Sequence, residues 1–249
     1  MSTKRTGIML VGHGTRDETG TAQFFQLGKL LAETVNPVPV VPCLLEFQSP
    51  TIPEAWNQLV ESGAEHICVA PLLLFAAGHA KQDIPNLIRE CQEQSQHVSV
   101  SQTGPLSRHG AIVDLVQQRI EQAAHNRPSE STALVMVGRG SHDPCAQADM
   151  RVLTEVIGRR FQFTHVATAY YAMADPKLPD VLDQVAARGD IDTVIVQPHL
   201  LFEGRLFQAI ERQVTEASER HPSIQFETTG YLGPEQNVAA AIASRIESC

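Results

Sequence analysis

Two histidines and one glutamate in the first half of the chain have the types and positions that metal or proton chemistry requires. His13 stands between two glycines, and Glu46 and His79 each follow an apolar run. Neutral imidazole binds first-row divalent metals, and a carboxylate offsets part of their charge. An imidazole with a pKa of about 6.5 also accepts protons at neutral pH. The trio therefore predicts either a metal site with open coordination positions or a site of proton abstraction.

The elements that position these residues are read from the apolar pattern. Runs rich in β-branched residues alternate with amphipathic stretches along the whole chain, which predicts alternating strands and helices. The expected strands are 7–11, 38–45, 66–73, 98–103, 133–137, 165–171, 193–197 and 224–228. The expected helices are 17–34, 52–61, 82–94, 108–124, 145–160, 178–187, 206–220 and 235–247.

Parallel strands need crossover helices, so this order predicts an α/β fold whose functional loops follow the carboxyl ends of the strands. His13, Glu46 and His79 all stand at such ends. We therefore expect their side chains to converge in one crevice.

The second half of the chain repeats the first with an offset of 126 residues. Gly14 meets Gly140, Pro50 meets Pro176, and Asp17 meets Asp143, both expected helix N-caps. At such loop positions the backbone geometry restricts the choice of residue, so the match of glycines and prolines indicates a shared fold. We predict two similar domains, 1–126 with the metal site and 131–249 as a degenerate repeat, each a parallel four-stranded sheet flanked by helices. Two half-barrels that close into one (β/α)₈ barrel are the alternative.

The two halves differ at the three positions that carry chemistry. Arg139 stands opposite His13, Ala172 opposite Glu46, and Arg205 opposite His79. The second half has therefore lost the candidate metal ligands, which disfavours a symmetric site shared by both halves.

Composition and charge exclude several classes of protein. The chain has 249 residues and a formal net charge of -9, so general affinity for nucleic acid or anionic membranes is not expected. No apolar run reaches the roughly 18 residues of a membrane span, and the apolar part of the start is too short for a signal peptide. The five cysteines form no CxxC pair, which argues against a disulfide framework or a thiolate metal site. A cytoplasmic protein is expected.

Three segments of the first half carry a resemblance to a known family. They are Gly-His-Gly-Thr-Arg-Asp at 12–17, Leu-Glu-Phe-Gln-Ser-Pro-Thr-Ile at 45–52, and Pro-Leu-Leu-Leu-Phe-Ala-Ala-Gly-His at 71–79, followed by Asp83-Ile84-Pro85. The chain resembles the class II chelatases of tetrapyrrole biosynthesis, in particular the long, two-domain sirohydrochlorin cobaltochelatases and ferrochelatases of bacteria. The resemblance covers nearly the whole chain, and it implies a lyase that inserts Co²⁺ or Fe²⁺ into sirohydrochlorin without ATP.

The resemblance also implies roles for the three residues. His13 and His79 match the histidines that bind the metal and take part in proton removal, and Glu46 matches the glutamate beside them. The imidazoles would hold the metal on one face of the ring, while Glu46 balances charge and helps to accept a proton. The sequence has no Gly-x-x-x-x-Gly-Lys-Ser/Thr phosphate loop, so no nucleotide is expected. Asp83 either orients His79 from behind or faces solvent.

An acidic chain that binds an anionic tetrapyrrole needs local positive charge. The candidate carboxylate clamps are Arg16, Lys81, Arg139 and Arg205. A guanidinium pairs bidentately with a carboxylate, which an imidazole cannot do. We hypothesise that the exchange of histidine for arginine turned a duplicate metal face into a face that holds the substrate.

The sequence is also compatible with two other functions. A bilobal metal or tetrapyrrole delivery protein would bind its ligand without turnover, and a (β/α)₈ metal-dependent lyase or hydrolase would combine both halves at one barrel mouth. Ligand types alone do not rank Co²⁺ against Fe²⁺, so the sequence predicts neither the metal nor the choice between cobalamin and sirohaem synthesis. A fused pair of domains has less need of a second chain, so we expect a monomer.

Overall fold

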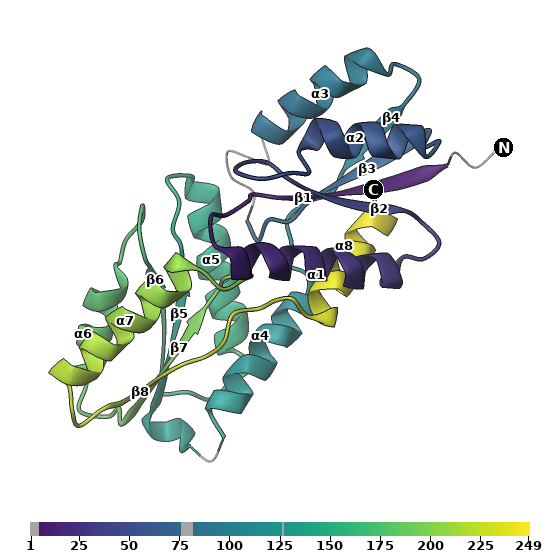
Figure 1. Ribbon diagram of the computed structural model, residues 1–249. Coiled ribbons are helices and arrows are strands. Elements are labelled where there is room, and N and C mark those ends of the chain that lie inside the picture. Colours follow the sequence, from purple (N-terminus) through teal and green to yellow (C-terminus); the bar gives the residue numbers. More distant parts are fainter. Residues whose placement is uncertain (1–4, 76–81, 126) are drawn as a thin grey trace. The chain divides into compact units, whose positions relative to one another are not determined.

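The computed structural model describes residues 5–75, 82–125 and 127–249 (Figure 1). Strands and helices alternate along these residues, as the sequence predicts. The first half contains β1 (Thr6–Gly12), α1 (Glu18–Thr34), β2 (Val40–Leu44), α2 (Ile52–Glu61), β3 (His66–Pro71), α3 (Ile84–Gln94), β4 (Ser99–Gln102) and α4 (Gly110–Ala123). The second half contains β5 (Thr132–Gly138), α5 (Pro144–Gly158), β6 (His165–Tyr170), α6 (Leu178–Ala186), β7 (Thr193–Pro198), α7 (Arg205–Arg220), β8 (Gln225–Thr228) and α8 (Gln236–Glu247).

In the described parts of the chain, the strands form two four-stranded sheets with the orders β2-β1-β3-β4 and β6-β5-β7-β8. Every neighbouring pair of strands is parallel. The predicted fold class is therefore confirmed. The single closed barrel is wrong, because each sheet is open and ends in two edge strands.

The sheet order brings the candidate loops of the first half to one edge. β1 pairs with β2 on one side and with β3 on the other. The carboxyl ends of parallel neighbours lie at the same edge of a sheet, so the loops after β1, β2 and β3 leave it together. The second sheet places β5 between β6 and β7 in the same way.

The chain divides into two compact units. They differ from the predicted segments 1–126 and 131–249 because the last helix of each segment belongs to the other unit. The first unit is Met1–Ala111 with Gly233–Cys249, and the second is Ile112–Leu232. In the first unit α8 packs against α1, and Gln236 Nε2 donates to Thr34 Oγ1 at 3.0 Å. The apolar pattern of a helix tells which of its faces is buried but not which unit it completes, so this exchange was not predictable from periodicity.

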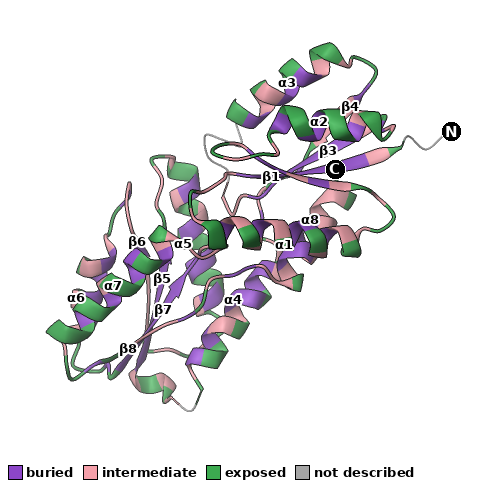
Figure 2. Cartoon of the chain, in the orientation of Figure 1, coloured by how far each residue is buried: buried purple, intermediate pink, exposed green. Residues whose placement is uncertain are grey.

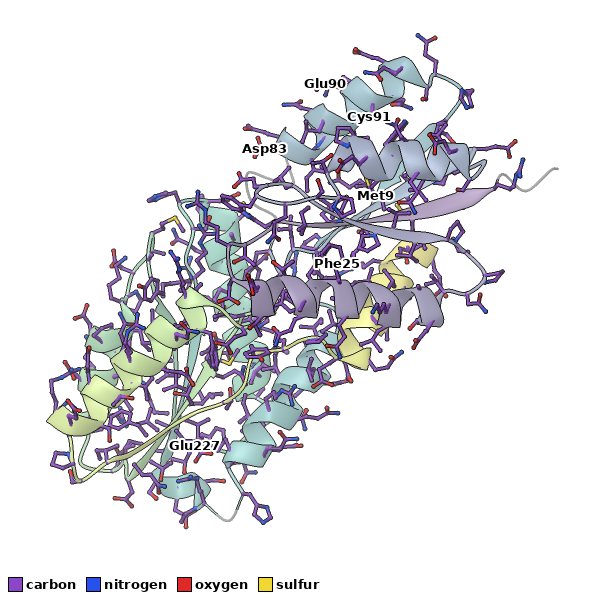
Figure 3. All side chains as sticks on the ribbon, in the orientation of Figure 1. Met9, Phe25, Asp83, Glu90, Cys91 and Glu227 are labelled. Carbon is purple, nitrogen blue, oxygen red and sulfur yellow. The ribbon has the colours of Figure 1, made fainter. Side chains whose placement is uncertain are left out.

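Buried residues follow the strands and the inward faces of the helices in each unit (Figure 2). In the first unit the core joins strand residues such as Met9 to Trp56 of α2 and Cys91 of α3; Figure 3 labels Met9 and Cys91. Six of the seven residues of β1 are buried, as expected for a central strand covered on both faces.

Local signals explain where several helices begin. Asp17 Oδ1 accepts from Gly20 N at 2.9 Å before α1, and Asp143 Oδ1 accepts from Cys145 N at 2.9 Å before α5. Both aspartates are therefore N-caps, as predicted. Thr51 and Glu54 form a capping box at the start of α2. Within the described ranges, no helix combines the length and apolar composition needed to cross a membrane.

Candidate metal and tetrapyrrole site

The loops that carry His13 and Glu46 are hydrogen-bonded to each other through their backbones. Leu45 N donates to Gly12 O at 2.9 Å, and Glu46 N donates to His13 O at 3.0 Å. The imidazole and the carboxylate therefore start from directly joined backbone positions at the carboxyl edge of the sheet. His13 is half-buried and Glu46 is exposed. The backbones of the two loops therefore meet, while the convergence of the two side chains stays a prediction.

The ring of His13 contacts the carbonyl of the next residue. Nδ1 of His13 lies 3.2 Å from Gly14 O. A carbonyl oxygen only accepts hydrogen bonds, so this contact is favourable in the tautomer that carries its proton on Nδ1. In that tautomer Nε2 holds the lone pair, which makes it the ring nitrogen suited to a metal ion.

Gly14 makes the close approach of the two loops possible. Its φ is 91°, and a Cβ built on it would overlap the carbonyl oxygen of Glu46. Gly140 of the second unit has the same φ of 91°, and a Cβ there would overlap the carbonyl oxygen of Ala172. A residue with a side chain cannot take this position without moving the partner loop.

Further contacts hold the loop that follows β2. Thr21 Oγ1 of α1 donates to Gln48 Oε1 at 2.9 Å, and Leu44 N donates to Pro50 O at 2.7 Å. At the end of the loop the capping box lowers the pKa of Glu54, chiefly through its hydrogen bond from the Thr51 backbone. Glu46 thus projects from a segment that is tied at both ends.

His79 and Lys81 lie outside the described residues, which are interrupted at 76–81. On one side of that interval, Leu72 N donates to Val11 O at 2.8 Å, so the chain leaves β3 beside the end of β1. On the other side, Asp83 is exposed and directly precedes α3 (Figure 3). Among the described residues no three histidine, cysteine, aspartate or glutamate side chains gather as a metal site. The approach of His79 to His13 stays a prediction.

Arg16 lies beside the loop of Glu46. Its guanidinium carbon is 5.2 Å from the centre of the Phe47 ring, within the range of a cation–π contact. The loops after β1 and β2 therefore carry an imidazole, a carboxylate and a guanidinium. Phe47 itself was missed as a candidate, because nothing in the sequence shows that its ring is exposed. The available signal was its place directly after Glu46.

The second unit repeats this loop geometry with different side chains. Tyr171 N donates to Gly138 O and Ala172 N to Arg139 O, both at 2.9 Å. Arg139 follows β5, Arg205 is the first residue of the helix after β7, and both are exposed. Since β5 and β7 are neighbours, the two arginines stand at one edge of this sheet, and their role as carboxylate clamps stays a prediction.

A buried polar group lies near the same edge of the second unit. His199 directly follows β7 and is 2% exposed, and burial lowers its pKa to about 3. Its backbone N donates to Val137 O at 2.8 Å, just as Leu72 N donates to Val11 O in the first unit. His199 therefore occupies the position of Leu72 and stays neutral near neutral pH. The sequence did not single it out.

Comparison with known proteins agrees with this arrangement. The model of the CbiX family matches residues 7–123 and again 133–249. A sirohydrochlorin ferrochelatase of Priestia megaterium is 32% identical over 97% of this chain and 89% of its own length. A sirohydrochlorin cobaltochelatase of the same organism is 28% identical over 96% of this chain and 78% of its own length.

Two solved structures are similar over nearly the full chain. SirB from Bacillus subtilis with Fe³⁺ has a TM-score of 0.89 and 27% identity and covers 98% of this chain and 95% of SirB. SirB from Bacillus subtilis subspecies spizizenii in complex with cobalt has a TM-score of 0.82 and 28% identity, with coverages of 98% and 94%. The resemblance to the two-domain sirohydrochlorin chelatases is confirmed. The chain belongs to the CbiX family and contains the family's domain twice.

Proposed function

We propose that this chain is a sirohydrochlorin chelatase that inserts Co²⁺ or Fe²⁺ into the tetrapyrrole. The observation that carries the proposal is the direct joining of the His13 and Glu46 loops at the carboxyl edge of the first sheet. This arrangement occurs in a chain that matches SirB, a protein solved with Fe³⁺ and with cobalt, over nearly its whole length. The metal is a substrate in this reaction, and no nucleotide takes part.

In the proposed mechanism His13 and His79 hold the incoming ion through imidazole nitrogens. Two protein ligands leave coordination positions that the ring nitrogens take one after another, so the ion is never without ligands. Each inner N–H of the macrocycle gives up its proton as a nitrogen–metal bond forms, and the two protons balance the charge of the M²⁺ ion. Glu46 is exposed, so it can accept a proton and pass it to water.

Cationic side chains hold the carboxylates of the substrate in this proposal. Arg16 and Lys81 act beside the metal ligands, and Arg139 and Arg205 act from the second unit. The support is their placement: Arg16 lies against the loop of Glu46, and the other two arginines stand at one sheet edge, at positions that match His13 and His79 in the sequence. Guanidinium groups suit carboxylates because they form two parallel hydrogen bonds.

An anaerobic assay of the purified chain tests this function. Sirohydrochlorin is mixed with each metal, and absorbance follows insertion over many equivalents of substrate per protein. The proposal predicts multiple turnovers with at least one of Co²⁺ and Fe²⁺, above the rate without protein. Binding that stops at one equivalent would instead identify a protein that delivers metal or tetrapyrrole. Curated relatives divide between the two metals, so the same assay ranks them.

We also propose that the chain works as a monomer in the cytoplasm. Support comes from the doubled domain, which supplies two similar sheets within one chain. Light scattering after size-exclusion chromatography tests the monomer, with a mass of 27.2 kDa expected.

A further inference from the structure

Phe47 carries the most exposed large apolar side chain in the described parts of the protein, with 54% of its surface exposed. The other two, Val152 and Val156, lie on α5 of the second unit. Phe47 directly follows Glu46, so its ring belongs to the candidate site of the first unit. A single exposed phenylalanine elsewhere on a surface would need no explanation. Phe47 does need one, because it lies next to Glu46 and because its backbone is held in an unusual conformation.

The backbone of Phe47 has φ of 72°, in the left-handed region that bulky residues rarely adopt. Met173, its counterpart in the second unit, has φ of 54°. Both loops contain the same tight turn, closed by a backbone hydrogen bond across the residue with positive φ. Gln48 N donates to Glu46 O at 3.0 Å, and Ala174 N donates to Ala172 O at 2.7 Å. The fold therefore imposes the strained conformation, while the exposed aromatic ring belongs to the first unit alone.

Glycine takes a positive φ without strain, so a large side chain at this position is costly for the backbone. Met173 shares this strain, so the feature particular to the first unit is the exposed aromatic ring that the strained backbone holds. Hydrogen bonds of the surrounding loop stabilise the strained conformation of Phe47. Thr21 Oγ1 donates to Gln48 Oε1, and Leu44 N donates to Pro50 O.

Arg16 places a positive charge beside the exposed ring of Phe47. Its guanidinium carbon lies 5.2 Å from the centre of the Phe47 ring, and it comes from the loop that also carries His13. An aromatic ring beside a cation suits a ligand that is both flat and anionic, because the ring contacts a π-face and the cation pairs with a carboxylate. A planar macrocycle with peripheral carboxylates has both features.

We propose that Phe47 is a substrate-contacting residue whose ring packs against the macrocycle and holds it over His13 and Glu46. This inference rests on the proposed function, since it takes the anionic tetrapyrrole as the ligand. It assigns to Phe47 a part in substrate binding and orientation and none in holding the metal.

The variant Phe47→Gly separates this role from a structural one. Glycine removes the ring and also removes the backbone strain, so the melting temperature should stay equal or rise. The Kd for metal-free sirohydrochlorin, followed by its absorbance, should rise about tenfold, and KM should rise with it, because a lost aromatic contact costs about one factor of ten. The Kd for Co²⁺ alone should be unchanged. Phe47→Trp should restore both constants to within about twofold of the wild type.

Two control variants match these changes. Met173→Gly makes the same backbone change in the second unit and reports how much of any change in melting temperature comes from the positive φ. Val152→Ala removes apolar surface from an exposed helix face and should leave the Kd for sirohydrochlorin unchanged.

A Phe47→Gly protein that binds sirohydrochlorin with the wild-type Kd would overturn the inference. The proposed function is judged separately, by turnover of the wild-type chain. A wild-type protein that inserts neither metal fails that proposal, while the titration with metal-free macrocycle still decides whether Phe47 contacts it.

Discussion

His13 is held by its own loop in an orientation that selects one ring nitrogen for chemistry. The contact between Nδ1 and Gly14 O favours the tautomer whose lone pair is on Nε2. The role of His13 therefore requires a partner that accepts the lone pair of Nε2. A metal ion bound between joined loops satisfies that requirement.

Replacement of His13 tests this role at the scale of one residue. We expect His13→Ala to lower kcat/KM for metal insertion at least about 100-fold, the lower range for loss of a group acting in proton transfer or metal holding. Folding should be nearly unaffected, because the ring is only half-buried. The matched control is His97→Ala, an exposed histidine of the same unit, which should keep wild-type activity. Equal activity in both variants would contradict the assignment.

His199 makes a prediction about pH and stability. Its pKa in the folded chain, about 3, lies below its value of about 6.5 in the unfolded chain. Between these values the unfolded chain binds more protons, so stability falls as the pH drops through this window, by at most about 1.4 kcal/mol per pH unit.

Leucine is the residue at the matching position of the first unit. We therefore expect His199→Leu to weaken the dependence of stability on pH. Urea unfolding of the two proteins at pH 7 and pH 4.5 measures it. The loss of stability between the two pH values should be smaller in the variant. An identical loss in both proteins would show that His199 does not titrate in this way.

At the scale of elements, the joining of the two loops depends on Gly14 and has a matched counterpart in Gly140. Gly14→Ala and Gly140→Ala should each destabilise the protein by about 2 kcal/mol or more, because both the positive φ and the clash with a backbone oxygen oppose a side chain. Only Gly14→Ala should also weaken Co²⁺ binding, since it separates the loops of His13 and Glu46.

Thermal unfolding and metal titration of both variants measure these effects. Gly104→Ala is a suitable control, because a Cβ there meets nothing within 4 Å. Equal loss of Co²⁺ affinity in the Gly14 and Gly140 variants would show that the effect is not local to the first unit.

Several elements were predictable because their signals are local. Asp17 predicted the start of α1, and the alternating pattern predicted the strand that leads to His13 and the one that leads to Glu46. These strands and their parallel order also predict that the backbone loops of His13 and Glu46 lie side by side. The left-handed conformation of Phe47 was not predictable, because no glycine or asparagine marks that position.

At the scale of the whole molecule, the duplication gives two units with the same sheet order and different loop chemistry. The comparison of halves predicted which unit carries the candidate ligands. It did not predict that α8 completes the first unit and α4 the second, since both helices have the same kind of apolar face. Tertiary packing decides which unit each of these helices completes. The strand order is the same in both sheets, so His13 follows the central strand β1 and Arg139 follows the matching strand β5.

The most direct measurement compares two double variants, His13→Ala/His79→Ala and Arg139→Ala/Arg205→Ala, in separate titrations with Co²⁺ and with sirohydrochlorin and in the insertion assay. Division of labour between the units predicts that the first variant loses Co²⁺ binding and insertion but still binds sirohydrochlorin, whereas the second keeps Co²⁺ binding and shows a raised KM for the tetrapyrrole. Full-speed insertion of cobalt and iron by the double histidine variant would contradict the account.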